Sequence, residues 1–452
     1  MFKKQYYFFT IVIFSAIIIS CNQQQAGTEK SSTVLWNKQT NIYEVNLRQY
    51  SASGSIASFA KNLPRLKEMG VQILWFMPIT PIGKQGRKMN ETELGSYYAV
   101  RDYKAINEEF GTMDDWKQLV KTAHEMGFVV ITDWVANHTA LDNSWVTAHP
   151  GFYAKDSTGK IISPFDWTDV YKLNYKNAEL RDSMIAVMKF WLTETGIDGF
   201  RCDVAEEVPQ DFWKQCIDSL RKIKNVFMLA EGEKPWMHRA GFNVTYAWEM
   251  MHVMKDLYKG DKTVLQFDSI LNHSIALYPK DAGRLYFTSN HDENSWNGTE
   301  YEKYGDAAKA FAVFTQTIYQ SIPLIYSGQE EPNTKRLKFF VKDTIAFRDF
   351  SLAGFFFFFL LLRKSNPALA FDAEYKKLKT TNDRVIFAYL REASGHKVAV
   401  ILNFSGKPQQ FSISDKALAG IPENVFLGKP EIVAEIQTFD LPPWGYLVYD
   451  YK

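Results

Sequence analysis

The chain has 452 residues, of which 46% are apolar and 23% are charged, so it can bury a large core and global disorder is excluded. This length is too great for one small domain but suits a large barrel with a modest second domain. The 52 basic and 51 acidic residues leave a formal net charge of +1. Binding to the phosphate backbone of nucleic acids requires a strong basic excess, so nucleic acid is not an expected partner.

The N-terminus has the features of an export signal. Lys3 and Lys4 precede an apolar run over residues 6–20, which is short for a membrane span but suits a secretory signal. Ser20, a small residue directly before Cys21, resembles the end of a bacterial lipoprotein signal. That resemblance implies cleavage before Cys21 and a lipid on its sulfur. The alternative is an ordinary signal peptide with an incidental cysteine.

We therefore expect a signal peptide over residues 1–20 and a flexible tether over 21–33, which is rich in Gln, Ser and Thr. The protein would be exported and held by the lipid on Cys21 to a bacterial membrane, on the periplasmic face or at the cell surface.

Past residue 33, apolar runs typical of strands alternate with amphipathic helical stretches. The expected strands are 42–47, 71–78, 128–135, 199–204, 226–231, 244–248, 285–289 and 324–327, and helical patterns between them include 55–69, 114–126, 178–195, 209–224 and 304–320. Repeated alternation of strand and crossover helix predicts an α/β fold with a parallel sheet. Eight repeats favour a closed TIM (β/α)₈ barrel, which we place over residues 34–366.

Two segments depart from this repeat. Residues 138–174 have no good helical pattern and are rich in Asp, His, Trp, Gly and Pro, which indicates a short lobe inserted after the third strand. Residues 367–452 show short alternating strands, typical of a C-terminal antiparallel β-sandwich domain. Between barrel and sandwich, five Phe and three Leu in succession at 355–362 predict a helix that covers the barrel and packs on the C-terminal domain.

Apart from Cys21, the chain has two cysteines, Cys202 and Cys216, and no CxxC spacing, so a zinc or redox centre has no support. The two cysteines could pair in an oxidising compartment, but two buried thiols are the more common arrangement.

Acids, an arginine and histidines stand at the ends of four expected strands. The runs are DWVANH at 133–138, GFRCDVA at 199–205, AEGE at 230–233 and SNHDEN at 289–294, and GSYYAVRDY at 95–103 follows the second strand. A single acid at a strand end is more often a helix cap. Four runs in phase with the barrel repeat instead favour one shared site, because the carboxyl ends of the strands meet at one face.

Glycoside hydrolysis requires such a set of groups. An ionised carboxylate attacks the anomeric carbon while a protonated one donates to the leaving oxygen, about 5–5.5 Å away in the retaining mechanism. Arg201 and Asp203 point the same way from one strand, so the guanidinium is expected to hold Asp203 ionised. Glu231, from the next strand, is expected to stay protonated through desolvation and nearby negative charge. Asp292 can hold sugar hydroxyls and favour a distorted ring.

The four runs resemble, in order, the four sequence regions of the α-amylase family of glycoside hydrolases, and the resemblance covers roughly residues 34–452. It implies that Asp203 is the nucleophile, Glu231 the general acid/base and Asp292 the transition-state stabiliser. It also implies supporting roles at positions around these acids: Arg201 orients the nucleophile, His138 and His291 bind sugar hydroxyls, Tyr98 stacks on the sugar, and Asp133 supports the site from below.

A finer resemblance, carried by KLN at 172–174 and DVAEEV at 203–208, is to the neopullulanase and cyclodextrinase branch. True α-amylases usually carry a Lys-His pair where Glu206 and Glu207 stand. Its absence weakens the family's calcium site, because a backbone oxygen of that His is one ligand. Asn137 matches another ligand, but calcium needs several oxygens. The chemistry is expected to need no cofactor, and a structural calcium ion stays open.

Together these features predict a retaining glycoside hydrolase that cleaves α-1,4-glucosidic bonds in starch-derived α-glucans, such as maltodextrins, cyclodextrins, starch or pullulan, through a covalent glycosyl-enzyme. A 4-α-glucanotransferase would use the same site with a sugar as acceptor, and no motif decides between the two. A non-catalytic glucan-binding relative is the weaker alternative, because all three acids are present. The expected partners are the glucan and, through Cys21, a membrane, and the chain is expected to be a monomer.

Overall fold

The computed structural model describes residues 36–87 and 93–451. The expected signal peptide, tether and lipid attachment at Cys21 lie outside the described residues. Within these ranges, no helix combines the length and the apolar character that crossing a bilayer requires.

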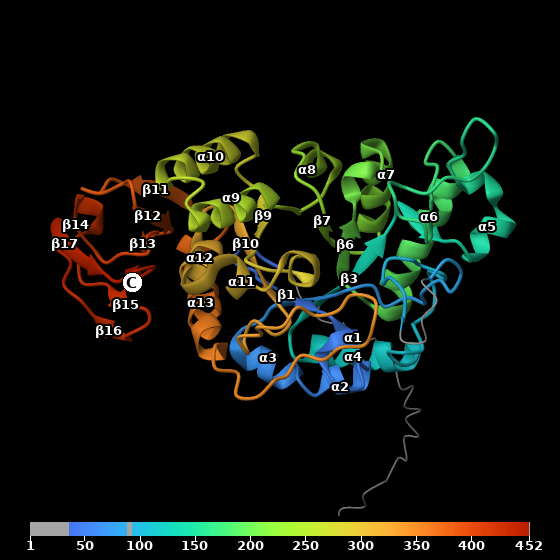
Figure 1. Cartoon of the computed structure of the whole chain (residues 1–452), viewed down its shortest axis with the longest axis horizontal. Coiled ribbons are helices and arrows are strands. Elements are labelled where there is room, and N and C mark those ends of the chain that lie inside the picture. The colour runs from blue at the N-terminus through green and yellow to red at the C-terminus, as the bar shows by residue number, and fades with distance from the viewer. Residues whose placement is uncertain (1–35, 88–92, 452) are drawn as a thin grey trace, which may run out of the picture. The chain divides into compact units, whose positions relative to one another are not determined.

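A closed barrel of eight parallel strands forms the centre of the fold, as the sequence predicts (Figure 1). Around the barrel the order is β1, β10, β9, β8, β7, β6, β3 and β2. The strands are β1 (Ile42–Val45), β2 (Ile73–Phe76), β3 (Val129–Val135), β6 (Gly199–Asp203), β7 (Phe227–Ala230), β8 (Val244–Tyr246), β9 (Gly283–Tyr286) and β10 (Ser321–Tyr326). Every residue of these strands is buried, which explains their nearly continuous apolar runs.

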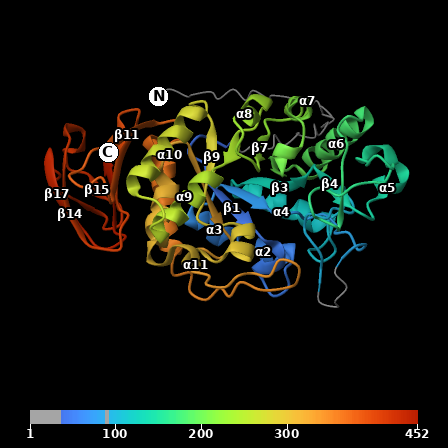
Figure 2. The ribbon, with the colours of Figure 1, turned by 45° about the horizontal axis from the view of Figure 1, so that its top comes forward.

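Helices surround the strands, as Figures 1 and 2 show. The longer ones are α3 (Leu63–Met69), α4 (Met113–Glu125), α6 (Ala178–Phe190), α7 (Gln210–Arg221), α9 (Trp248–Lys259), α10 (Val264–Leu277), α12 (Ala308–Thr317) and α13 (Ala353–Ser365), and the shorter ones are α1 (Leu47–Tyr50), α2 (Ile56–Ala60), α8 (Trp236–Ala240) and α11 (Glu300–Tyr304). The expected helix over 55–69 is divided between α2 and α3, where Pro64 stands in the first turn of the second helix. Proline is tolerated there because the first helical N–H groups have no partner within the helix.

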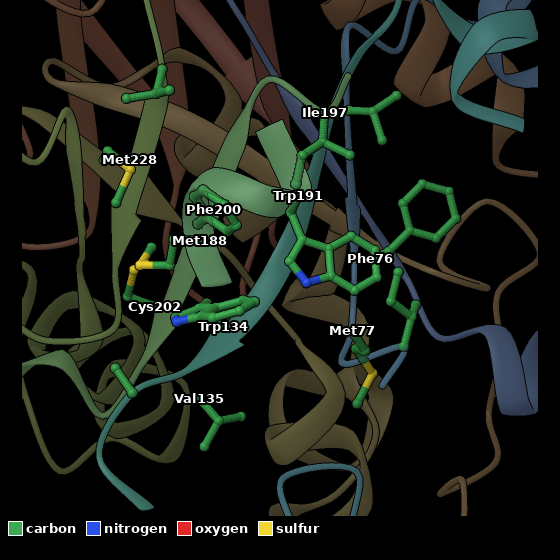
Figure 3. Close-up of a cluster of buried hydrophobic side chains, with 14 of the residues drawn as sticks. Phe76, Met77, Trp134, Val135, Met188, Trp191, Ile197, Phe200, Cys202 and Met228 are labelled. Atoms are coloured by element: carbon green, nitrogen blue, oxygen red, sulfur yellow. The ribbon is translucent and has the colours of Figure 1, made fainter. Parts of the chain in front are cut away.

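Tightly packed aromatic and sulfur side chains fill the space between the strands and α6 (Figure 3). The rings of Trp134 on β3 and Phe200 on β6 meet edge to face with their centroids 5.4 Å apart. The Trp134 indole N–H points to the sulfur of Met184 on α6 at 3.3 Å. Cys202 and Cys216 are free and buried, as the sequence predicts. This packing fixes β3 and β6, which carry the polar groups of the site described below.

The inserted lobe contains a two-stranded antiparallel sheet, β4 (His138–Ala140) with β5 (Val170–Lys172). It also contains a short helix, α5 (Ser144–Ala148), which the sequence did not lead us to expect. The side chain of Asn143 caps α5 by accepting from the Trp145 N–H. The helix has only five residues and none of them is fully buried, so it is too short for a helical periodicity to reveal.

The C-terminal region is an antiparallel β structure of two sheets, as expected. One sheet has the order β11, β12, β13, β18, β15, β16, and the other pairs β14 with β17. The strands are β11 (Glu374–Leu378), β12 (Ile386–Ala393), β13 (His396–Asn403), β14 (Gln409–Ser414), β15 (Glu423–Asn424), β16 (Lys429–Pro430), β17 (Ile436–Leu441) and β18 (Tyr446–Tyr451). Apolar side chains of both sheets share one core, as in a sandwich.

The run of phenylalanines at 355–362 lies in α13 and contacts both the barrel and the C-terminal region, as the sequence predicts. Phe356 packs with the barrel core, while Phe355 and Phe359 place their rings 5.8 Å and 5.3 Å from that of Phe426. Within residues 355–362 the outer face of α13 also lacks polar groups, so Phe358 and Leu361 remain 38% and 48% exposed.

Truncating the buried face of α13 should destabilise the fold. Phe359 is 1% exposed, so Phe359→Ala leaves a cavity and should lower the free energy of unfolding by about 3–5 kcal/mol. The matched change Leu361→Ala, two residues on and half exposed, should cost about 1 kcal/mol or less. Denaturant unfolding of both variants checks this, and equal losses would contradict the assigned burial of the helix.

Candidate active site

The polar side chains marked in the sequence meet at the carboxyl ends of the barrel strands. Strand register pairs Asp133 on β3 with Arg201 on β6, and Val135 with Asp203. Arg201 and Asp203 are two residues apart and therefore project from the same face of β6. Glu231 directly follows β7, the neighbour of β6 in the barrel. Three separate strands thus bring acids to one arginine.

The guanidinium of Arg201 is the shared contact of these acids. It is fully buried. Its Nη1 donates to Asp133 Oδ1 at 2.9 Å and to Asp203 Oδ1 at 3.1 Å, and its Nη2 forms an ion pair with Glu231 Oε1 at 3.0 Å. Its Nε donates to the hydroxyl of Tyr246 at 3.2 Å. A planar cation with several fixed donors suits this task, because each carboxylate is held in one orientation.

Asp203 is less readily ionised than its arginine neighbour leads one to expect. Burial raises the pKa of Asp203 well above its usual value, the charge of Glu231 raises it further, and Arg201 opposes both. The expectation that Arg201 alone keeps Asp203 ionised is therefore incomplete, because it omits desolvation and the other acids. The second oxygen, Oδ2, is buried and has no hydrogen-bond partner among the described residues.

Glu231 is held by hydrogen bonding and by charge. Its Oε2 accepts from the Val204 N–H at 2.8 Å while Oε1 faces Arg201. These contacts fix the orientation of both Glu231 oxygens, and the expectation that Glu231 is protonated stays a prediction.

Two unusual backbone conformations position Glu231. Val204 has a φ of +43°, which is rare for a β-branched residue, and this turn directs its N–H to Glu231. Gly232, with φ +154°, lies so close to Glu206 that an added Cβ would be 2.4 Å from the Glu206 side chain. Strained backbone of this kind is concentrated at functional sites.

Asp292 and His291 enter from the loop after β9. His291 Nδ1 lies 2.5 Å from Glu44 Oε1, and its Nε2 lies 2.7 Å from the Tyr98 hydroxyl and 3.3 Å from Asp292 Oδ2. Burial disfavours the imidazolium, but Asp292 and Glu44 outweigh it and raise the pKa of His291 to about 9. Burial also raises the pKa of Asp292, with His291 opposing.

Asp133 lies beneath the other acids. Besides binding Arg201, it accepts from the Tyr98 hydroxyl at 3.1 Å and from the Trp75 indole N–H at 3.3 Å. Burial raises the pKa of Asp133 to about 6, although Arg201 lowers it. The contacts agree with the expected support from below, and a continuous chain runs from Arg201 through Asp133 and Tyr98 to His291.

His138 differs from His291 in charge. It is buried at the edge of the cleft, and burial lowers its pKa to about 3, so the ring is neutral. Its Nδ1 lies 3.3 Å from the side-chain nitrogen of the adjacent Asn137. No group of three or more His, Cys, Asp or Glu that could hold a metal ion occurs in the described part of the chain. A structural calcium ion at Asn137 stays a prediction, and no step below depends on a metal.

An open cleft of about 770 Å³ lies over these groups. It is lined by the three acids Asp203, Glu231 and Asp292, by further acids that include Glu206 and Glu207, and by seven aromatic rings: Tyr98, Phe165, Trp167, Trp248, Trp296, Phe339 and Phe340. Glu207 forms an ion pair with Lys172 of the lobe at 3.6 Å. Aromatic faces with acids below suit a neutral sugar polymer.

Sequence reasoning missed several residues of the site. Glu44, Trp75 and Tyr246 come from strands without a recognised motif, although a lone acid in the buried run IYEV is a signal that could have revealed Glu44. Phe339 and Phe340 lie in the long irregular segment between β10 and α13, where an adjacent aromatic pair is the only visible sign.

Comparisons with known proteins agree with this geometry. The family model for the α-amylase catalytic domain matches residues 27–171 and 164–350. A crystal structure of an α-amylase from Lactobacillus plantarum is 30% identical, with a TM-score of 0.82, and the match covers 92% of this chain and 99% of that one. A noncanonic maltogenic α-amylase, AmyB from Thermotoga neapolitana, is 28% identical, with a TM-score of 0.83 and the same coverage of both chains.

Among sequence relatives, the α-amylase MalA of Haloarcula japonica is 25% identical over 394 residues, which are 82% of this chain and 56% of that protein. The chain therefore spans little more than half of that relative. Proteins named cyclomaltodextrinase and neopullulanase also match, in agreement with the finer resemblance in the sequence.

The two cleft histidines should show opposite protonation. We expect NMR of ring-labelled protein, with signals assigned by His291→Gln and His138→Gln, to find His291 charged and His138 neutral throughout pH 5–8. The charge of His291 adds stability that is complete below about pH 6.5 and is lost as the pH rises through about 9. Neutral His138 has the opposite pH dependence. Its contribution to the free energy of unfolding is complete above about pH 6.5 and is lost as the pH falls below that value. A titration of either ring near its usual pKa would contradict the described contacts.

Proposed function

Because the chain belongs to the α-amylase family of glycoside hydrolases, we propose that it hydrolyses α-1,4-glucosidic bonds in starch-derived glucans through a covalent glycosyl-enzyme. One observation carries the proposal: Asp203 and Glu231 bind the same buried guanidinium, and Asp203 keeps one oxygen without a partner. A retaining glycosidase needs two neighbouring carboxyl groups of this kind.

In the first step Asp203 Oδ2 attacks the anomeric carbon while the bond from that carbon to the glycosidic oxygen breaks. Arg201 holds the other oxygen of Asp203, and Oδ2 has no competing hydrogen bond among the described residues. The proton goes from Glu231 to the leaving oxygen, which departs as the hydroxyl of the shortened glucan. In the second step Glu231 takes a proton from water, water attacks the anomeric carbon, and the bond to Asp203 breaks.

The acid cluster supports the presence of the required proton. Asp133, Asp203 and Asp292 all have raised pKa values, chiefly through burial, and Asp133 and Asp203 share one arginine with Glu231. Groups this close titrate as a set, so the set retains protons in a range where isolated carboxyl groups have lost them.

The remaining residues would bind the sugar at the cleavage point. Neutral His138 presents a ring nitrogen to hydroxyls, Asp292 accepts from them, and the half-buried ring of Tyr98 offers a stacking face. Charged His291 is buried against Glu44, Tyr98 and Asp292, so it would act on the sugar by holding Tyr98 and Asp292 in place. Glu206 and Glu207 line the same cleft. The two glutamates favour short maltodextrins and cyclodextrins over long starch, following the neopullulanase and cyclodextrinase resemblance.

The proposal predicts that purified protein converts maltoheptaose and cyclodextrins to shorter linear products. Asp203→Asn removes the attacking charge and should lower kcat by about 10⁴-fold or more, with an unchanged thermal midpoint. Chromatography of the products and calorimetry of the variant check this.

Two further variants sharpen the result. Glu231→Gln should partly spare the first step on an activated aryl glycoside, whose leaving group needs little protonation. The control Asp211→Asn changes an exposed acid on α7 and should retain full activity. If the products are mainly longer than the substrate, the enzyme is a glucanotransferase and the proposed hydrolysis is wrong. Full activity of Asp203→Asn would exclude Asp203 as the nucleophile.

We also propose that the protein is exported and lipid-anchored through Cys21, supported by the charged start, the apolar run 6–20 and Ser20. Metabolic labelling with a radioactive fatty acid should mark the wild-type chain in the membrane fraction. Cys21→Ser should lose the label and move to the soluble exported fraction. A labelled Cys21→Ser protein would exclude this anchor.

A further inference from the structure

The outer face of α13 carries apolar side chains that stay exposed to solvent. Phe358 and Leu361 are 38% and 48% exposed, and the half-buried ring of Phe357 lies 5.9 Å from that of Phe358. The two phenylalanines stand four and three residues before Leu361, so all three lie on one side of the helix. Leu427, 62% exposed, directly follows Phe426, whose ring lies 6.1 Å from that of Phe358. We call Phe357, Phe358, Leu361 and Leu427 the apolar stripe.

Two lysines stand at the carboxyl end of this stripe. Lys364 is exposed and comes three residues after Leu361, on the same side of α13. Lys67 of α3 lies near it, because burial and then the charge of Lys364 lower the pKa of Lys67. Within the described residues, neither lysine forms an ion pair with an acid. Apolar side chains beside free cations are typical of a surface that lies on an anionic bilayer.

The described part of the chain begins beside these lysines. Trp36, Lys67 and Lys364 line one pocket of about 170 Å³. The ring of Trp36 also meets that of Phe227 edge to face, with 5.2 Å between centroids. Phe227 is the first residue of β7, so the pocket lies at the amino ends of the barrel strands. The active-site cleft lies at the opposite ends of the same strands.

The proposed lipid on Cys21 would remain close to this part of the surface. Cys21 stands 15 residues before Trp36, and a fully extended chain of that length spans about 50 Å at most. The flexible tether predicted from the sequence would separate the two by roughly 20–25 Å on average. Phe358 stands six residues before Lys364, or about 9 Å along the helix. A bilayer that holds the lipid is therefore within reach of the lysines and of the apolar stripe.

We propose that the apolar stripe and the two lysines rest on the surface of an anionic phospholipid bilayer, to which the lipid on Cys21 holds the chain. This inference rests on the proposed lipid anchor. The apolar side chains would enter the boundary between headgroups and acyl chains, while the lysines contact phosphate groups. With 13 residues, α13 is too short to cross the bilayer and would lie on it. The bilayer would leave the cleft uncovered for dissolved glucans.

Vesicle binding tests this surface in a chain without the lipid. At low ionic strength, the exported Cys21→Ser protein should co-sediment with vesicles of phosphatidylglycerol and phosphatidylethanolamine. Adding Phe358→Ser and Leu361→Ser together should weaken the binding about tenfold, because less apolar surface enters the bilayer. Adding Lys364→Glu should weaken it by a similar factor and reduce its dependence on salt, because an attractive charge becomes a repulsive one.

Matched controls separate the surface from general changes in polarity and charge. Leu265→Ser alters an apolar residue on α10 that is 53% exposed, and Lys155→Glu makes the same change of charge on the exposed side of the inserted lobe. Both should bind vesicles like the parent Cys21→Ser protein. All variants should retain full activity on maltoheptaose in solution, because none of these residues lines the cleft.

The outcomes distinguish this inference from the proposals on which it rests. No vesicle binding by the parent, or equal binding by all variants, would overturn the inference. A dimer in sedimentation velocity that dissociates on Phe358→Ser and Leu361→Ser would assign the apolar stripe to a second copy of the chain and would also overturn it. A wild-type chain that takes up no fatty acid, but whose vesicle binding depends on the stripe, would overturn the proposed anchor alone.

Discussion

The buried guanidinium of Arg201 is the interaction on which the site depends. Asp133, Asp203 and Glu231 come from three strands and would repel one another by about 4 kcal/mol per pair at 4 Å and an effective dielectric constant of 20. A single cation with fixed donors makes their approach favourable and orients each of them. The parallel register of β3 and β6 sets the cation opposite Asp133 and two residues from Asp203. The packing of β3 and β6 against α6 therefore influences catalysis, because it fixes the position of the Arg201 side chain.

The site contains more acidic than basic side chains, and this excess suits general acid/base catalysis. Arg201 and charged His291 face Glu44, Asp133, Asp203, Glu231 and Asp292. With two cations against five acids in a largely buried environment, the set favours bound protons. His291 connects its two parts, because one ring nitrogen meets Glu44 and the other meets Tyr98 and Asp292. Proton location in the cleft is thus a property of the whole set.

The sequence was sufficient to predict the eight strands, the C-terminal sheets and the meeting of Asp203, Glu231 and Asp292, because continuous apolar runs and strand-end motifs are strong local signals. Glu44, Tyr246 and Phe339 were not predicted, since each joins the site through the closure of the barrel or an irregular loop. The influences on the pKa of Asp203 were incompletely predicted for a related reason. Its pKa follows from burial and from acids on other strands, whereas the sequence showed only its neighbour Arg201.

The phenylalanine run in α13 gives the two parts of the chain a joint interior. Phe359 and Leu362 of the helix, Phe311 and Phe314 of α12, and Phe387 and Tyr389 of β12 belong to one apolar cluster. The expected boundary between residues 366 and 367 therefore separates the barrel from the C-terminal sheets, but the two share one hydrophobic core. A barrel produced without the β-sandwich would leave the apolar faces of α12 and α13 open to water, and exposed apolar surface of that kind promotes aggregation.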